Sequence, residues 1–167
     1  ATIFVTSIWL RANRDAAAEL AADPLFSIQA HGAAHKPASV SGRKAYGIRG
    51  TGSVTELVEE VEGNARAIEA ITGKRPRWYR SGTAHYDATA VAVIHRMGFR
   101  IAGFSRNGDE GATLPPDGVR DRILAANDRD IILCHVNRPR SGTAKGLRAA
   151  LPALLDAGVI FVFLPEN

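Results

Sequence analysis

The sequence predicts a single α/β domain, residues 1–167, with a mostly parallel sheet or barrel. Short apolar runs rich in Ile, Val and Phe alternate with longer amphipathic stretches along the whole chain. Turn and capping residues stand where the amphipathic stretches begin and end. This alternation is typical of parallel sheets, because each helix returns the chain to the start of the next strand. With 46% hydrophobic residues, the chain can bury a sizeable core.

The apolar runs are too short for helices, and several are dense in β-branched residues, so they predict strands. The predicted strands cover residues 2–8, 25–30, 77–80, 99–104, 130–134 and 159–164. The predicted helices between them cover about 13–22, 53–72, 87–97, 117–127 and 144–157.

Local signals support the helix boundaries. Ser53 with Glu56 forms a capping box before the longest helix, and Asp87 is suited to be the N-cap of the next one. Glycines stand where helix ends favour a left-handed residue, at positions 73, 98 and 158.

Composition restricts the function classes. The net charge of +4 favours anionic partners, but the basic residues are scattered and no nucleic-acid-binding module is recognisable, so we expect no nucleic-acid partner. No apolar run is long enough for a membrane span, and the first residues lack the pattern of a signal peptide. The single cysteine, Cys134, excludes an internal disulfide and a cysteine zinc cluster, and we expect it in the core.

Ionisable side chains follow four of the predicted strands, and parallel sheets place their sites at the carboxyl ends of strands. In chain order these side chains are His31 with His35, Arg80, Asp109 and His135. Two imidazoles four residues apart can meet one metal ion. The alternative is that His31 ends a buried strand and His35 is a solvated loop residue.

Six short pieces of the sequence occur in a distinctive order: "ATIFVTS", "HGAAHKP", "ITGKRPRWYRSGTAHYD", "GFSRNGD", "IILCHVN" and "LLDAGVIFVFLPE". In this order they resemble the polysaccharide deacetylases of carbohydrate esterase family 4, over nearly the whole chain. The resemblance implies the family's fold, a distorted parallel (β/α) barrel. It also implies a metal-dependent hydrolase that removes N-acetyl groups from a glycan by cleaving a linear amide bond.

The resemblance assigns roles to particular residues. It makes His31 and His35 ligands of a divalent ion, with zinc favoured and cobalt or nickel as alternatives. It makes Arg80 the residue that orients the catalytic base, with a backbone N–H near Thr83 facing the oxyanion. His135 corresponds to the group that protonates the leaving amine. The remaining assignments are the acid that holds His135, which is Asp109 or alternatively Glu110, and two groove-lining residues, Tyr79 and His85.

The chain also departs from the family pattern. The family's Thr-Phe-Asp-Asp motif, which supplies the catalytic base and a third metal ligand, is absent, and the chain begins where the second strand would begin. We therefore expect a barrel that lacks its first strand, with the edge of the strand at Thr2 covered by another segment or by a second copy. The alternative functions are a carbohydrate- or metal-binding relative with impaired catalysis, and a hydrolase of another small amide. The resemblance favours a periplasmic or secreted protein of the bacterial cell envelope.

Overall fold

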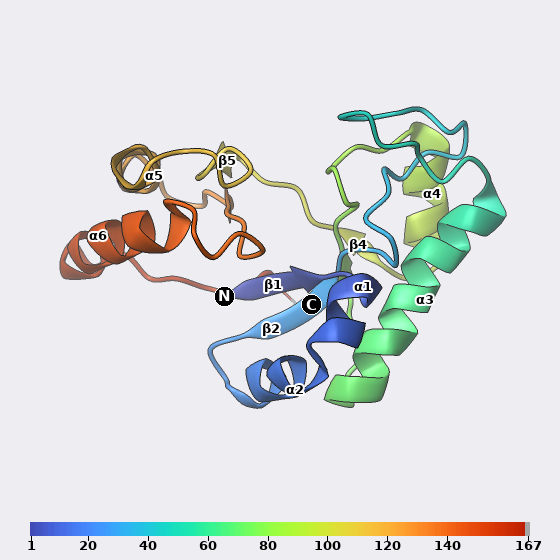
Figure 1. Cartoon of the computed structure of the whole chain (residues 1–167), viewed down its shortest axis with the longest axis horizontal. Coiled ribbons are helices and arrows are strands. Elements are labelled where there is room, and N and C mark those ends of the chain that lie inside the picture. The colour runs from blue at the N-terminus through green and yellow to red at the C-terminus, as the bar shows by residue number, and fades with distance from the viewer. Residues whose placement is uncertain (166–167) are drawn as a thin grey trace. The chain divides into compact units, whose positions relative to one another are not determined.

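The computed structural model describes residues 1–165, and its contacts divide the chain into two compact units. The first unit comprises Ala1–Ala102 and the segment that begins at Val162, and the second comprises Gly103–Phe161. All strand pairs in the described residues are parallel, and helices connect most of the strands (Figure 1). The predicted α/β class with parallel strands is therefore confirmed.

The first unit is built on a four-stranded sheet in the order β1-β2-β3-β4. Its strands are Thr2–Val5 (β1), Ser27–Ala30 (β2), Trp78–Tyr79 (β3) and Arg100–Ile101 (β4). β1 lies at one edge of this sheet, bonded to β2 in a register that pairs Thr2 with Ser27. On its other side, no strand within residues 1–165 pairs with β1.

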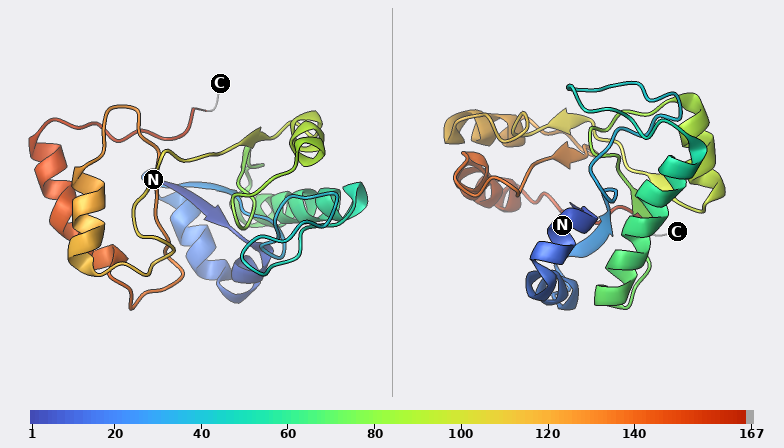
Figure 2. Two further views of the ribbon diagram at one scale, coloured as in Figure 1. Left: turned by 90° about the horizontal axis from the view of Figure 1, so that it is seen from above. Right: turned by 45° about the vertical axis from the view of Figure 1, so that its right-hand side comes forward.

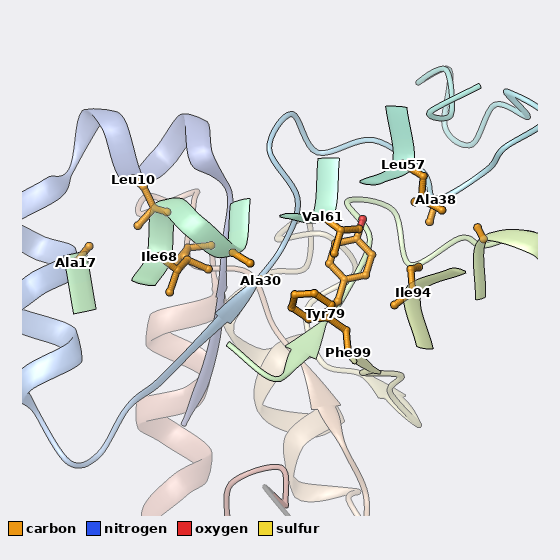
Figure 3. Close-up of a cluster of buried hydrophobic side chains, with 13 residues drawn as sticks. Leu10, Ala17, Ala30, Ala38, Leu57, Val61, Ile68, Tyr79, Ile94 and Phe99 are labelled. Carbon is orange, nitrogen blue, oxygen red and sulfur yellow. The ribbon is translucent and has the colours of Figure 1, made fainter. Parts of the chain in front are cut away.

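Four helices accompany this sheet, and the longest of them carries most of the packing. They are Ser7–Ala12 (α1), Arg14–Ala22 (α2), Val54–Thr72 (α3) and Ala88–Arg96 (α4). Helix α3 packs against β2 and against the other three helices (Figure 2). Its buried residues Leu57, Val61 and Ile68 recur at helical spacing and meet Tyr79 and other side chains in one core (Figure 3). No helix in the described part of the chain is both long and apolar enough to cross a membrane.

The second unit has a smaller core between two helices. Strands Arg106–Asn107 (β5) and Ile132–Leu133 (β6) form a parallel pair, and helices Pro116–Leu124 (α5) and Thr143–Asp156 (α6) pack on each other. Gly146 permits the close approach of α5 and α6, because a Cβ there would lie 2.5 Å from the Cβ of Val119. A larger residue at this position would push the helices apart.

The capping signals are confirmed where the structure tests them. The Ser53 hydroxyl accepts a hydrogen bond from the Glu56 amide at 3.1 Å, and Asp87 accepts one from the Ala90 amide at 2.8 Å. Gly73 ends α3 in the left-handed conformation, with φ of 69°. The five predicted helices form within one to three residues of their expected bounds.

Three predicted strands differ from the structure. The first strand ends at Val5, because the Thr6 hydroxyl caps a helix that begins at Ser7. The bulky apolar residues of the segment 7–10 resemble a continuing strand and gave no sign of this helix. The run 99–104 contains only β4, and a separate strand, β5, follows it. The predicted strand 159–164 is wrong: no strand among the described residues pairs with it, and Ile160 and Val162 are 84% and 83% exposed. An apolar run forms a strand only where a neighbouring strand takes up its backbone hydrogen bonds.

Truncation of Leu57 tests the role of α3 in the first core. Leu57 is completely buried, so Leu57→Ala is expected to lower the free energy of unfolding by about 2–5 kcal/mol, through lost burial and the cavity left behind. Denaturant unfolding measures this change. The matched control is Val58→Ala, one residue further along the helix and 36% exposed, for which we expect about 0.5 kcal/mol or less. Equal losses in the two variants would contradict this packing.

Candidate functional site

The loop that follows β2 carries His31 and His35, and α3 holds its first turn. The buried side chain of Asn64 accepts hydrogen bonds from the backbone amides of His31 and Gly32, at 2.9 and 3.0 Å. The Asn64 amide group in turn donates to the Ser7 hydroxyl at 3.1 Å. One side chain thus accepts from two backbone donors at the point where the chain leaves the sheet, although the His31 amide also donates to the Val5 carbonyl at 3.1 Å.

Glu60, one helical turn before Asn64, holds the rest of this loop. Its carboxylate is buried and accepts from the backbone amides of Ala34 and Lys36, each at 3.0 Å. Its backbone carbonyl accepts from the Ala33 amide at 2.9 Å. Because residues four apart share one helix face, Glu60 and Asn64 together fix the backbone path from residue 31 to residue 36.

The two imidazole rings lie against each other with a defined orientation. Their centroids are 4.9 Å apart and their planes are nearly perpendicular, at 87°. Nδ1 of His31 lies 2.7 Å from the carbonyl oxygen of Arg80. A carbonyl oxygen only accepts, so Nδ1 carries the proton and Nε2 is the ring nitrogen suited to bind a metal ion.

The segment after β3 packs directly on the backbone of His35. A Cβ at Gly82 would lie 2.2 Å from both the carbonyl carbon and the carbonyl oxygen of His35, so only glycine fits there. His35 itself adopts φ of 60°, a conformation that non-glycine residues seldom take. The loop after β2 and the loop after β3 therefore form one packed surface within the first unit.

Arg80 lies beneath this surface. Only 7% of it is exposed; its Nε donates to the Ala102 carbonyl at 3.0 Å, and its guanidinium lies 4.4 Å from the ring centroid of Phe4. Burial lowers the pKa of Arg80 from its ordinary range. A cation held over an aromatic face in this way is a fixed positive charge near β1.

The segment 81–86 supplies further polar groups near His35. The Ser81 amide donates to the Tyr86 hydroxyl at 2.8 Å, which fixes the turn. The side-chain oxygen of Thr83 is buried without a partner, and no acceptor within residues 1–165 takes the Thr83 amide. His85 is exposed, and its Nδ1 donates to the Thr83 carbonyl at 2.7 Å.

Tyr79 requires a correction, since it was expected to line a substrate groove. Its side chain is completely buried and points into the core toward Val61 and Phe99 (Figure 3). Successive residues of a strand point to opposite faces, and Tyr79 lies on the face that packs against the core. A substrate cannot reach it in this structure.

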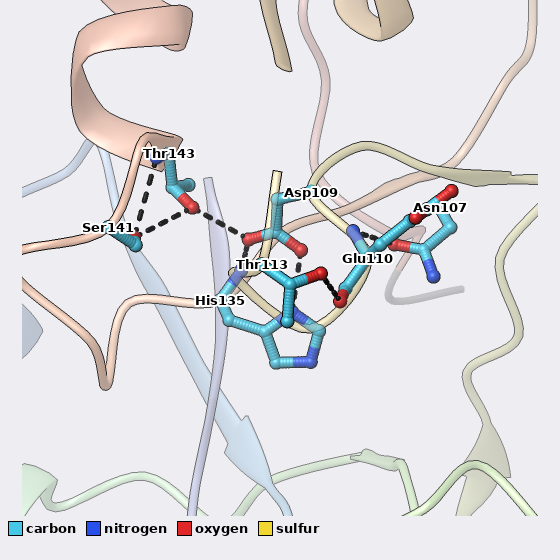
Figure 4. A network of polar contacts seen from close by, with 7 residues as sticks. All are labelled: Asn107, Asp109, Glu110, Thr113, His135, Ser141 and Thr143. Carbon is cyan, nitrogen blue, oxygen red and sulfur yellow. Dashed lines mark hydrogen bonds and ion pairs between the residues drawn. The ribbon is translucent and has the colours of Figure 1, made fainter. Parts of the chain in front are cut away.

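In the second unit, His135 and Asp109 form a closely bonded pair (Figure 4). Nδ1 of His135 lies 2.7 Å from one carboxylate oxygen of Asp109. The other oxygen accepts from the His135 amide at 2.6 Å and from the Thr143 hydroxyl at 2.9 Å. Asp109 is completely buried, whereas the His135 side chain is 34% exposed, so the ring can reach a ligand while the carboxylate cannot.

The environment of Asp109 favours its charged form. Burial by itself would raise the pKa of Asp109, but hydrogen bonds from the side chain and amide of His135 and from Thr143 outweigh it and lower the pKa. Because the ionised carboxylate only accepts, the proton of the imidazole resides on Nδ1. Nε2 is therefore the ring nitrogen available for proton transfer.

The two neighbours of this pair have other roles. Glu110 forms an ion pair with Arg122, so Asp109 is the acid that contacts His135. Cys134 packs with the second core, where a Cβ at Gly108 would lie 2.8 Å from its sulfur. Burial, followed by the nearby charge of Asp109, raises the pKa of Cys134 to about 12, and a protonated thiol of this kind is not a nucleophile.

The described residues contain no group of three or more His, Cys, Asp or Glu side chains placed to hold a metal ion. His31 and His35 therefore provide two ligand positions. Their donor chemistry fits a divalent ion such as zinc, since both are imidazoles and the proton of His31 is held away from Nε2.

Sequence reasoning missed three residues that position these groups: Glu60, Asn64 and Thr143. A signal for the first two was present, because both lie on the apolar face of the helix that carries Leu57, Val61 and Ile68. Polar side chains on a buried helix face need hydrogen-bond partners, and the backbone amides of a nearby loop can supply them. Thr143 carried no comparable signal.

Comparisons with known proteins bear on both units. A family model described as "Polysaccharide deacetylase" matches residues 1–102. No match was found among the curated proteins.

Solved structures with the same fold include a pseudoenzyme of carbohydrate esterase family 4 from Bacillus anthracis, with a TM-score of 0.77 and 20% identity over 95% of this chain and 51% of that chain. A family 4 carbohydrate esterase from Streptomyces lividans in complex with acetate has a TM-score of 0.77 and 17% identity, over 95% of this chain and 75% of that one. A family 4 acetyl xylan esterase from Clostridium thermocellum with a cobalt ion has a TM-score of 0.77 and 18% identity, over 97% of this chain and 73% of that one. The chain spans about half the length of the first of these structures, and the likeness confirms the predicted fold class.

Replacement of Asn64 tests how the histidine loop is held. Asn64→Leu keeps the volume but leaves the amide of Gly32 without its acceptor and removes one of the two acceptors of the His31 amide, so we expect a loss of about 1–3 kcal/mol in unfolding free energy. Amide hydrogen exchange at Gly32 should also become faster. The matched control is Glu59→Gln, on the exposed face of the same helix, which should change neither quantity. Unaltered exchange in Asn64→Leu would rule out this role.

The pKa of Asp109 predicts a stability change in acid. Its folded-state pKa is lowered below the ordinary 3.8, so its contribution is fully present above the unfolded-state value and is lost as pH falls through the folded-state value. Asp109→Asn cannot accept all three hydrogen bonds, so at neutral pH we expect it to be less stable by about 1–3 kcal/mol. Urea unfolding of both proteins from neutral pH into acid should show the difference shrinking below the ordinary pKa. A pH-independent difference would exclude a charged Asp109.

Proposed function

Because this chain belongs to the polysaccharide deacetylase family, we propose that it is a metal-dependent hydrolase that removes N-acetyl groups from a glycan. The observation that carries the proposal is the His31 and His35 pair at the carboxyl end of β2, with the proton of His31 held on Nδ1 by the Arg80 carbonyl. The alternatives are a glycan-binding relative without turnover and a hydrolase of another small amide.

His31 and His35 are the residues of this chain that hold the ion. When bound, a divalent ion of this kind supplies Lewis-acid activation of water and of the acetamide carbonyl. The cobalt ion of the Clostridium thermocellum esterase supports a divalent ion in the proposal, with zinc favoured and cobalt or nickel as alternatives. Asn64 and Glu60 keep the loop in the conformation that brings the two rings together.

Thr83 and His85 are proposed to meet the substrate beside this pair. The backbone amide of Thr83 has no acceptor in the described structure and lies in the loop that packs on His35. It is suited to donate to the acetamide oxygen as negative charge develops there. The earlier assignment of Arg80, as the residue that orients a catalytic base, stays a prediction.

His135 is proposed as the group that protonates the departing amine. Asp109 holds Nδ1 of the ring, which orients the imidazole. Nε2–H is then the proton that the amine receives. The likeness to a family 4 carbohydrate esterase covers 95% of the chain, including the segment that carries His135.

Acetate release from N-acetylglucosamine oligomers tests the proposal, on this chain and on any longer protein that contains it. We expect His135→Ala to lower turnover by about 10²–10⁴-fold while oligomer binding is retained, since a proton donor acts in the transition state. Chelation should abolish turnover, and added zinc or cobalt should restore it.

The matched control is His95→Ala, an exposed histidine of α4, which should leave turnover unchanged. Circular dichroism checks that His135→Ala stays folded, and His135→Gln, which keeps a polar group near Asp109, provides a second variant. Oligomer binding without any acetate release would overturn the hydrolase and support the binding relative. Turnover that is insensitive to His135 would overturn the assigned proton donor.

A further inference from the structure

A short hairpin in the loop between β2 and α3 presents an aromatic ring to solvent. Ala45 and Ile48 exchange two backbone hydrogen bonds, of 3.0 and 2.9 Å. The two residues between them, Tyr46 and Gly47, have φ of 51° and 78°. Positive φ at both central positions defines a type I′ turn, which favours Asn or Gly at its first position.

Tyr46 is therefore a residue that the turn does not favour and that the core does not bury. It is 83% exposed, the highest value of any aromatic side chain in the described residues. A tyrosine gains nothing from this position through folding, since its ring buries little surface and its backbone conformation is unfavourable. A ligand that covers the ring would bury its apolar surface, which folding leaves exposed.

The base of the hairpin is rigid, so the ring is presented from a fixed frame. The Ser39 hydroxyl donates to Asp87 at 2.9 Å and accepts from the Arg43 amide at 3.1 Å. The Ser39 carbonyl accepts from the hydroxyl of Thr51, which is completely buried, at 3.0 Å. These bonds tie both sides of the hairpin to the N-cap of α4.

The ring of Tyr46 continues the surface of the candidate site within the first unit. It lies 5.3 Å from the ring of His85, with the two planes at 86°. His85 bonds to the Thr83 carbonyl, and Gly82 packs on His35. A continuous row of contacts thus leads from the histidine pair, through the loop after β3, to Tyr46.

We propose that Tyr46 is a stacking platform for a pyranose ring of the glycan, adjacent to the sugar that binds at the histidine pair. The inference rests on the proposed function for its substrate class. A pyranose has an apolar face of C–H groups that suits an aromatic ring, and the tyrosine hydroxyl can bond to a sugar hydroxyl. The platform makes the protein favour oligomers over single sugars.

A sugar suits this surface better than a protein partner does. A specific protein interface buries about 800 Å² on each side, and a hairpin tip with a single exposed ring offers much less. A sugar ring needs one flat aromatic face with polar groups around it. The exposed ring beside His85 meets that requirement.

The experiment compares two variants of Tyr46 for binding to N-acetylglucosamine and to its longer β-1,4-linked oligomers, by calorimetry. Tyr46→Asn suits the turn but removes the ring, so we expect equal or higher thermal stability together with about 3- to 10-fold weaker oligomer binding. Binding of the single sugar should not change. Tyr46→Phe keeps the ring and should retain most of the oligomer affinity. The matched control is Ile8→Ala, a 54% exposed residue of α1, which should alter neither ligand.

The outcomes separate this inference from the proposed hydrolase. Oligomer affinity that is the same in Tyr46→Asn and the unmodified chain would overturn the platform, even if acetate is released normally. A ring-dependent preference for oligomers without acetate release would support the platform while the hydrolase fails. Binding of no oligomer by the unmodified chain would overturn the platform as well.

Discussion

The need to satisfy buried backbone amides after β2 is the constraint on which the candidate site depends. Where the chain leaves the sheet after residue 31, its amides lose strand partners and need other acceptors. Asn64 and Glu60 of α3 accept hydrogen bonds from four of these amides, at residues 31, 32, 34 and 36. The helix that forms most of the first core therefore also sets the path of the loop that carries both histidines.

Each unit fixes one histidine through Nδ1, but with a different partner. His31 bonds to a neutral carbonyl, whereas His135 bonds to the carboxylate of Asp109. A neutral acceptor orients the ring without adding charge, which suits an imidazole that binds a cation through Nε2. A carboxylate adds a negative charge beside the ring, which suits an imidazole that carries a second proton and then donates it. The proposed function therefore gives the two imidazoles different purposes, according to their partners.

Close backbone packing joins the loops of the first unit. Gly82 lies against the backbone of His35, and the segment it belongs to carries Thr83 and His85 before the N-cap of α4. Asp87 caps α4 and also accepts from Ser39, at the base of the hairpin that presents Tyr46. One short stretch, residues 82–87, thus connects the histidine pair, the Thr83 amide, which has no acceptor in the described structure, and the aromatic tip. A substitution in this stretch would therefore affect all three features.

The sequence by itself determined the α/β class, the five helices with their caps, and the placement of His31, His35, Arg80 and His135 after predicted strands. These follow from local rules, because periodicity, capping and strand ends depend on neighbouring residues. Only the tertiary structure decided that Asp109 rather than Glu110 contacts His135, that Tyr79 faces the core, and that residues 159–164 form no strand. Each of these depends on which distant segment packs against the residue. The choice of acid depends on a contact between residues 26 apart in the sequence, and the burial of Tyr79 depends on its packing against α3. A strand forms only where a neighbouring strand is available to pair with it. Hydrogen bonding between distant segments carries no periodic signal, so the Thr143 hydroxyl became visible as a partner of Asp109 only in the folded chain.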